Sequence, residues 1–481
     1  MIVKEFADYL FSLNYDNIDK KTIEQVKLCF IDFLGVYERG MEEKTPRSAN
    51  NALKHIYPGN SNLFNNAMTM AIAAHCLDLD DGHRFSQTHL GAVVFSTAIS
   101  IALKYEITGR EFFEAIIGGY EVGAIVGMIA NPNHRNQGFH STGTIGSFAA
   151  AAVASKLLKL SHTETINCFG ICGTSCSGLL ESDHQGSMAK SLHAGLAVRN
   201  GLSSAFLAHS GFTGPESIID GDEGFIRAMA IGDVQHSLDE INVALEEGNI
   251  KQVKTSINKI NPINNKKVER VVKTIGNNHI NQVYFKLYPF CRHLHSSVDS
   301  ILKLRPIIKE DYDSIEQIVI STYKIASQHD NFYPSNNEQL KQSLPYAVSI
   351  SIVCGEPDLN MIENLINKGL LEKDLNRIKD PQVLDIKKLV DKVVILENKQ
   401  FTLAYPDKSP SHINIKLNES FRGGKIENTT YYPIGENENP LDPGQIIAKF
   451  RKLNPDYVIN ELNLIDEIES SNLKDILTIL L

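Results

Sequence analysis

The stretch STGTIGSFAAAAVASKLLKL, residues 141–160, consists mainly of Gly, Ala, Ser and Thr, with larger apolar side chains at intervals. Residues 163–180 are again rich in Gly, Ser and Cys. Side chains this small allow the backbones of two helices to approach closely. Both stretches are therefore predicted to be helices at the crowded centre of a helical domain. The neighbouring segments 91–105 and 111–129 are apolar nearly all round, which is typical of helices buried inside a large core.

The pattern changes near residue 265. Helical spacing of apolar residues dominates before this point, and the sequence NPINNKK, residues 261–267, marks the shift. Between the β-type segments that follow, residues 339–353 and 361–371 have helical patterns. The segments with the alternation of β-strands are 283–287, 315–323, 393–396, 412–417 and the residues around the Gly423-Gly424 turn.

Helical spacing returns from Pro443 onward, at Ile446, Ile447 and Phe450, and this tail is expected to pack back onto the N-terminal helices. The chain is therefore predicted to be mainly α with an α+β second domain. Residues 1–265 with 410–481 would form the helical domain, and residues 266–409 the α+β domain. A cleft between two domains is the default place for a small-molecule site.

Composition and charge exclude several classes of protein. Of the 481 residues, 42% are hydrophobic and 22% charged, as in an ordinary globular protein. The chain has 47 Lys and Arg against 57 Asp and Glu, a net charge of −10. Without basic clusters, this charge argues against binding to nucleic acid or to an anionic membrane. The N-terminus lacks a signal-peptide pattern, and the longest apolar stretch, about residues 90–103, is shorter than the ~20 residues that span a bilayer. We therefore expect a soluble, cytoplasmic protein.

The seven cysteines form no dense framework and indicate reduced thiols, as in a cytosol. Cys168, Cys172 and Cys176 recur every four residues and share one face of the expected helix. A metal or redox site is one interpretation. Small neighbouring residues and the lack of a second ligand pair favour the other, a face used for close packing.

Five stretches hold most of the residues that could carry chemistry. The first is HCLDLDDGHRFSQTHLG, residues 75–91, which contains His75, Asp78, Asp80, Asp81, His83 and His89. Charged groups in apolar surroundings need partners. Asp and His are metal ligands, but neither the HExxH spacing nor the calcium-loop pattern is present. Asp80 and Asp81 fit equally well as residues that cap a neighbouring helix.

The second stretch is NQGFHSTGTIGS, residues 136–147, where His140 and Ser141 precede a helix. Their side chains and the free backbone N–H groups could face an anion, although a lone His is more often structural. The third is GSMAKSLHAG, residues 186–195. Here Lys190 and His193 lie among small and apolar residues, so Lys190 needs an anionic partner or extends to solvent.

The fourth stretch is FKLYPFCRHLHSSVD, residues 285–299, just past the expected domain boundary. The fifth, HSGFTGPE, residues 209–216, is mainly a turn. No nucleophile elbow, P-loop or dinucleotide fingerprint is present, which argues against nucleotide and nicotinamide cofactors. The remaining His, Lys and Asp residues suit proton transfer next to carboxylates, because His titrates near neutral pH and Lys stabilises an enolate.

Together these segments resemble the MmgE/PrpD family, whose members include 2-methylcitrate dehydratase, cis-aconitate decarboxylase and iminodisuccinate epimerase. The resemblance implies a large helical domain built from both chain ends, a smaller α+β lid domain, a homodimer, and catalysis without cofactor or metal. The segments that carry it are LDLDDGHR…THLGAVV, GYEVG, GFHSTGTIGSFAAAAVASKLLKL, GTSCSGLLE, MAKSLHAGLAVRNGL, GFTGPE and KLYPFCRHLHSSVD.

Residue by residue, the resemblance places the catalytic groups on Asp78, His89, His140, Lys190 and Lys286. Their neighbours in the same motifs are candidates to bind the substrate: Ser141, His193, Tyr288 and Arg292.

Two positions depart from the decarboxylase. Gly82 stands where the decarboxylase has Thr, and the lid tyrosine aligns near Gln328, so no tyrosine is assigned. The DDGHR…H form is closer to the epimerase-like branches of the family.

The leading hypothesis is a cofactor-independent enzyme that acts on a small di- or tricarboxylate, or on an imino or unsaturated relative. His140 or His89 would abstract a proton next to a carboxylate, Lys190 and Lys286 would bind carboxylates, and Asp78 would orient a His. Reprotonation on the other face would give epimerisation or isomerisation, and loss of a leaving group or of CO₂ would make the enzyme a lyase. The alternatives are a decarboxylase or dehydratase, a non-catalytic carboxylate-binding homologue, and a metal-dependent hydrolase.

Overall fold

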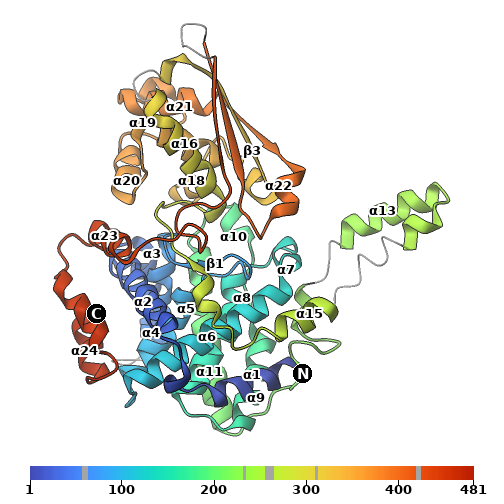
Figure 1. Cartoon of the computed structure of the whole chain (residues 1–481), viewed down its shortest axis with the longest axis vertical. Coiled ribbons are helices and arrows are strands. Elements are labelled where there is room, and N and C mark those ends of the chain that lie inside the picture. Colours follow the sequence, from blue (N-terminus) through green and yellow to red (C-terminus); the bar gives the residue numbers. More distant parts are fainter. Residues whose placement is uncertain (57–62, 231–233, 255–264, 309–311, 419–423) are drawn as a thin grey trace.

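A computed structural model describes residues 1–56, 63–230, 234–254, 265–308, 312–418 and 424–481. The protein is mainly α with an α+β second unit, as predicted. Buried side chains form two main hydrophobic cores, one in a large helical unit that holds both chain ends and one in a smaller unit. Figure 1 shows the smaller unit at one end of the molecule, with both termini in the large unit.

The large unit is a stack of helices. Two short strands, β1 (Gly82–His83) and β2 (Val283–Tyr284), pair antiparallel at its boundary with the smaller unit, with Gly82 opposite Tyr284. The helices are α1 (Ile2–Ser12), α2 (Lys20–Met41), α3 (Lys44–Ile56), α4 (Leu63–Cys76), α5 (Leu90–Ala102), α6 (Gly109–Ala130), α7 (Asn133–Asn136), α8 (Ser141–Leu157), α9 (His162–Ser175), α10 (Glu181–His184), α11 (Ala189–His209), α12 (Phe225–Met229), α15 (Asn265–Val272), α23 (Pro443–Leu453) and α24 (Leu473–Leu480). Figure 1 shows a further helix, α13 (Val234–Glu246), apart from this stack.

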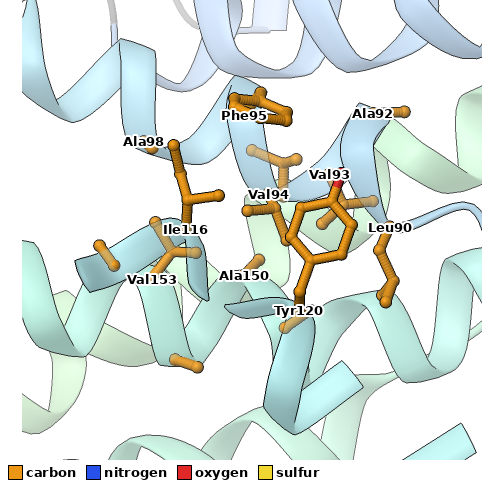
Figure 2. Close-up of a cluster of buried hydrophobic side chains, with 14 of the residues drawn as sticks. Leu90, Ala92, Val93, Val94, Phe95, Ala98, Ile116, Tyr120, Ala150 and Val153 are labelled. Atoms are coloured by element: carbon orange, nitrogen blue, oxygen red, sulfur yellow. The ribbon is translucent and has the colours of Figure 1, made fainter. Parts of the chain in front are cut away.

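The stretch of small residues forms α8, and it lies at the centre of this stack. Nearly every residue of α8 is buried, and so is every residue of α5. A Cβ on Gly201 of α11 would lie only 2.6 Å from the backbone carbonyl carbon of Ala150 and the backbone nitrogen of Ala151 in α8, so the two helices are in backbone contact. Figure 2 shows the large side chains that fill the remaining space between α5, α6 and α8, among them Phe95, Tyr120 and Val153.

The C-terminal tail packs on the N-terminal helices, as expected from its apolar spacing. The aromatic side chain of Phe450 in α23 lies against Gly35 of α2, where a Cβ would come within 3.0 Å of it. The Lys449 ammonium group is bonded to the buried carboxylate of Asp32 at 2.6 Å. Helix α6 is long and apolar enough to cross a membrane by length and composition alone, but most of it is buried inside the large unit.

The smaller unit is a mixed four-stranded sheet, in the order β4-β3-β5-β6, with helices packed on it. Strand β3 pairs parallel with β4 and antiparallel with β5. The predicted helix at 339–353 is split into α18 and α19 at Gln342 and Ser343, because the Ser343 side chain caps a new helix. The elements are α16 (His295–Ile308), β3 (Ile315–Thr322), α17 (Lys324–Ser327), α18 (Asn337–Lys341), α19 (Leu344–Cys354), α20 (Leu359–Asn367), α21 (Pro381–Val390), β4 (Val393–Glu397), α22 (Lys399–Ala404), β5 (Ser411–Leu417) and β6 (Lys425–Thr430).

The structure corrects the predicted domain boundaries. Strands β5 and β6 lie beyond residue 409, yet they complete the sheet of the smaller unit. Ile413 and Ile415 belong to the core of that unit. At the other end, Phe285 still lies in the large core and Tyr288 in the small one. The smaller unit therefore begins near residue 288 and extends past residue 430, because a strand must stay with the sheet that satisfies its backbone.

Replacing Gly201 by Ala tests the close packing at the centre of the large unit. We expect Gly201→Ala to lower the free energy of unfolding by about 1–3 kcal/mol, the usual cost of overpacking a core. Urea unfolding followed by circular dichroism measures this change. Gly146→Ala is the matched control on α8, because its Cβ would meet only methyl groups of Val93 and Ala197, at 3.2 and 3.4 Å. Equal stability of the two variants would contradict the backbone contact.

Candidate functional site

A cavity of about 90 Å³ lies where the two units meet. The large unit contributes Asp78, His89, His140 and Lys190 to its wall, and the smaller unit contributes Arg292 together with other residues described below. A wider hollow of about 980 Å³ shares part of this wall, including Arg135, Asp183 and Tyr323. Expected site residues from four of the five stretches thus line one cavity.

Asp78 is the centre of the charge arrangement. It follows the end of α4, is buried, and has a backbone φ of 56°, which is uncommon for a residue other than Gly. Lys286 donates to one carboxylate oxygen at 2.8 Å, and the Lys190 ammonium group lies 3.1 Å from the other. Lys190 also lies 3.3 Å from Asp183. Lys286 is completely buried beneath Asp78 and is absent from the cavity wall.

The charged groups of this cluster shift one another's pKa values. Burial alone would raise the pKa of Asp78, but the charges of Lys190 and Lys286 outweigh it and hold the pKa well below its usual value. Burial lowers the pKa of Lys286 despite the contact with Asp78. For Lys190, the carboxylates of Asp183 and Asp78 outweigh burial and raise the pKa. Asp78 is therefore an ionised structural and electrostatic anchor.

The expectation that Asp78 orients a His is wrong, because Asp80 has that role. The Nδ1 atom of His75 lies 2.7 Å from the Asp80 carboxylate, and Nδ1 of His89 lies 3.5 Å from the same carboxylate. Burial would raise the pKa of Asp80, but the neighbouring histidines outweigh it and lower the pKa to about 2. The rings of His75 and His140 stack with centroids 5.7 Å apart, which links this pair to the next motif.

Asp81 is a helix cap, one of the two interpretations open from the sequence. Its carboxylate accepts a hydrogen bond from the backbone N–H of Gly91 in the first turn of α5, at 2.9 Å. The Tyr120 hydroxyl donates to the other oxygen at 2.5 Å. Burial raises the pKa of Asp81 to about 7. Its side chain is fully engaged in holding the loop on α5 and α6.

His89 and His140 stand at the N-termini of two helices and both line the cavity. Nδ1 of His89 lies 2.7 Å from the backbone carbonyl of Asp81. A carbonyl oxygen only accepts, so Nδ1 carries the proton and Nε2 has the free electron pair. Burial lowers the pKa of His89 to about 4 and holds that of His140 well below its ordinary value. Both imidazoles are neutral at pH 7.

The four residues expected to bind substrate occupy different places. Ser141 is buried and bonded to Asn131, and Tyr288 is buried and donates to Asp299 at 2.7 Å; neither lines the cavity. His193 lies behind His140, with their Nδ1 atoms 2.9 Å apart. Arg292 does line the cavity, but its guanidinium group is 2.9 Å from Glu436.

Several cavity residues were missed from the sequence. Arg135 lines the cavity, and no ion pair of its guanidinium group is found among the residues that the structure describes. Tyr323 and Tyr405 also line it, with their rings stacked 4.6 Å apart. No lid tyrosine was assigned from the sequence, yet Tyr323, at the end of the predicted strand 315–323 and five residues before Gln328, lies on the cavity wall. The end of that predicted strand was the only feature of the sequence that pointed to Tyr323.

Two groups of side chains have the composition of a metal site, namely His75, Asp80 and His89, and Cys291, His293 and His329. The 2.7 Å contact between His75 and Asp80 is the length of a hydrogen bond, so it indicates a shared proton. Cys168, Cys172 and Cys176 are free thiols and buried, consistent with the expected packing face. All seven cysteines are free.

Comparison with known proteins agrees with the motifs. A model of the MmgE/PrpD N-terminal domain matches residues 4–237, and a model of the MmgE/PrpD C-terminal domain matches residues 288–475. These matches cover most of the chain, so the protein belongs to the MmgE/PrpD family.

Individual relatives are more distant. A cis-aconitate decarboxylase-like protein of Aspergillus oryzae is 24% identical over 411 residues, which cover 80% of this chain and 74% of the relative. A cis-aconitate decarboxylase of Aspergillus terreus is 24% identical over 399 residues, with the same coverage of 80% and 74%. The human cis-aconitate decarboxylase is 27% identical over 240 residues, covering 47% of this chain and 49% of the relative. The similarity supports a lyase or dehydratase type at the level of the family.

Replacing Asp78 by Asn tests its role as the anchor of the two lysines. We expect Asp78→Asn to lower the free energy of unfolding by about 3–5 kcal/mol, because it leaves buried cations without their counter-charge. Lys286→Met is the matched control and should cost less, since Asp78 keeps Lys190. Because the pKa of Asp78 is depressed, its contribution is present above about pH 4 and is lost as the pH falls further. Urea unfolding at several pH values measures both effects.

A larger loss for Lys286→Met than for Asp78→Asn would contradict this role. So would a stability difference between wild type and Asp78→Asn that stays constant into acid.

Proposed function

We propose that this protein is an enzyme that transfers a proton at a carbon next to a carboxylate of a small di- or tricarboxylate. The observation that carries the proposal is the shared cavity. Two neutral imidazoles, His89 and His140, line it together with two cations, Lys190 and Arg135. A cation beside a carboxylate stabilises the enolate that forms when the proton leaves. A neutral imidazole in the same cavity takes that proton.

Arg135 is the group that holds a substrate carboxylate. The other two arginines on the cavity wall are already neutralised, Arg84 by Glu436 and Glu438 at 3.0 and 2.6 Å, and Arg292 by Glu436 at 2.9 Å. The guanidinium fork binds a carboxylate through two parallel hydrogen bonds. Lys190, held by Asp78 and Asp183, contributes a second positive charge at a fixed place. Arg135 and Lys190 together therefore match a substrate with two carboxylates.

His89 is the base, because its tautomer is fixed by the Asp81 carbonyl. Its Nε2 is an electron-pair donor at neutral pH, and the depressed pKa keeps it so well into acid. His140 shares a proton with His193 through their Nδ1 atoms and acts as the second proton-transfer group. His75 and Asp80 position the rings of both.

The overall reaction is proposed as a lyase reaction, with loss of CO₂ or water, because the curated relatives are named as decarboxylases. A second candidate, an epimerase or isomerase, is favoured by Gly82. A Cβ at this position would lie 2.4 Å from the hydroxyl of Tyr284, which lines the cavity. The Tyr284 hydroxyl thus leaves no room for a side chain at the position where the resemblance to the decarboxylase implies a threonine.

Proton exchange in D₂O, followed by NMR, tests the proposal. We expect at least one of citrate, methylcitrate, cis-aconitate, malate or an aspartate-derived imino acid to take up deuterium or to lose CO₂ or water. His89→Gln is expected to slow this by at least ~100-fold, the lower range for a general base. His209→Gln, an exposed histidine far from the cavity, is the control. Full turnover by His89→Gln would overturn the assignment of the base.

Arg135→Gln tests carboxylate binding. Loss of a charge-assisted hydrogen bond costs about 1.5–3 kcal/mol, so KM is expected to rise roughly 10- to 150-fold with a smaller change in kcat. Arg135→Lys keeps the charge without the fork and should lie between wild type and Arg135→Gln. The exposed Arg377 offers a control in Arg377→Gln. An unchanged KM in Arg135→Gln would exclude this arginine from substrate binding.

A further inference from the structure

A second cluster of titratable side chains lies on the wall of the cavity that the smaller unit provides. Cys291 ends the loop that enters this unit, His293 lies in the short 3-10 helix that follows, and His329 comes two residues after α17. The Cys291 sulfur and one ring nitrogen of each histidine lie within 4.8 Å of one another. None of the three is used in the proton transfer proposed above.

The spacing within the cluster is that of ligands around one ion. Zinc binds a thiolate at about 2.3 Å and an imidazole at about 2.0–2.1 Å in tetrahedral geometry, which places sulfur and nitrogen roughly 3.6 Å apart. The Cys291 sulfur lies 3.7 Å from Nε2 of His329. The planes of the His293 and His329 rings are 26° apart, with ring centroids separated by 5.6 Å. Little movement is needed to bring the three atoms onto one ion.

Each histidine also has the outer partner that metal-binding histidines need. Nδ1 of His293 is 2.8 Å from the Tyr323 hydroxyl, which leaves Nε2 for an ion. Burial lowers the pKa of His329, and the backbone of Gln342 raises it in part, as an acceptor next to the ring does. Such partners fix the ring orientation and the tautomer of a metal ligand. The backbone N–H of Cys291 donates to the Lys341 carbonyl at 2.9 Å, so the cysteine is held in place as well.

The surroundings set the charge at this place. Burial, together with the carboxylates of Asp78 and Asp183, raises the pKa of the Cys291 thiol to about 11, so a metal ion must displace its proton to bind. Lys190 and Lys286 act on Cys291 in the opposite direction.

We infer that Cys291, His293 and His329 form a binding site for a divalent transition metal, with zinc the best match to one thiolate and two imidazoles. Cys291 and His293 both line the cavity, so the fourth coordination position faces it. Three protein ligands and one open position are the arrangement of a zinc ion that binds water or an anionic ligand. All three ligands belong to the smaller unit, whereas the proposed proton-transfer residues belong to the large unit.

Cobalt titration of the full-length, chelator-treated protein tests this inference. We expect about one Co²⁺ per chain, with the intense visible bands of tetrahedral cobalt and a thiolate-to-cobalt charge-transfer band in the near ultraviolet, and displacement of Co²⁺ by Zn²⁺. Cys291→Ser should abolish the charge-transfer band. His329→Gln should weaken binding by more than the 10- to 100-fold that loss of an outer partner costs, and Tyr323→Phe by an amount within that range.

Two controls separate this site from others. Cys354→Ser removes another half-buried thiol and should leave the titration unchanged. His75→Asn removes a member of the second group with metal-site composition and should also leave it unchanged. Absence of the charge-transfer band from the folded wild type, or its persistence in Cys291→Ser, would overturn the inference and leave a thiol–imidazole hydrogen bond. Loss of binding in His75→Asn alone would place the metal at the other group. None of these readouts depends on turnover.

Discussion

The buried carboxylate of Asp78 between two ammonium groups is the contact on which the rest of the site depends. Lys286 comes from the junction with the smaller unit, and Lys190 from α11, so one anion fixes the loop after α4 against both. A left-handed backbone at Asp78 persists only where surrounding contacts over-determine it, and the two ion pairs supply them. Removing three charges from water is costly, and only their mutual attraction makes the arrangement stable.

The loop that Asp78 anchors contains three aspartates within four residues, and their different surroundings give them different pKa values. Asp78 is held ionised by lysines, Asp80 by histidines, and Asp81 has a raised pKa and holds a helix end. Each outcome follows from which groups surround the carboxylate in an otherwise dry interior. The same loop then presents His89 to the cavity in a single tautomer. The backbone carbonyl of Asp81 thus determines which ring nitrogen of His89, the proposed base, carries the proton.

Much of the fold and many of the site residues could be predicted from local sequence. Each successful or failed prediction has a physical reason. The small residues of α8 and the alternation at 315–323 reflect packing and backbone geometry that act over a few residues. The domain boundary near 410 failed because β5 belongs to its sheet through pairing with β3, nearly a hundred residues earlier. The motifs identified the residue types at the site, but the assignment of a His to Asp78 failed because its lysine partners lie 112 and 208 residues away.

The two walls of the cavity show how similar residues acquire different chemistry. On the large-unit wall, His75 meets a carboxylate at hydrogen-bond distance, so a proton occupies the space between them. On the smaller-unit wall, His329 meets a thiol at 3.7 Å, and the other ring nitrogen of His293 is bonded to the Tyr323 hydroxyl. The first arrangement suits the proposed proton transfer, and the second suits the proposed cation site. Because the walls belong to different units, any shift between the units changes the distance between the two sets, while each set keeps its own geometry.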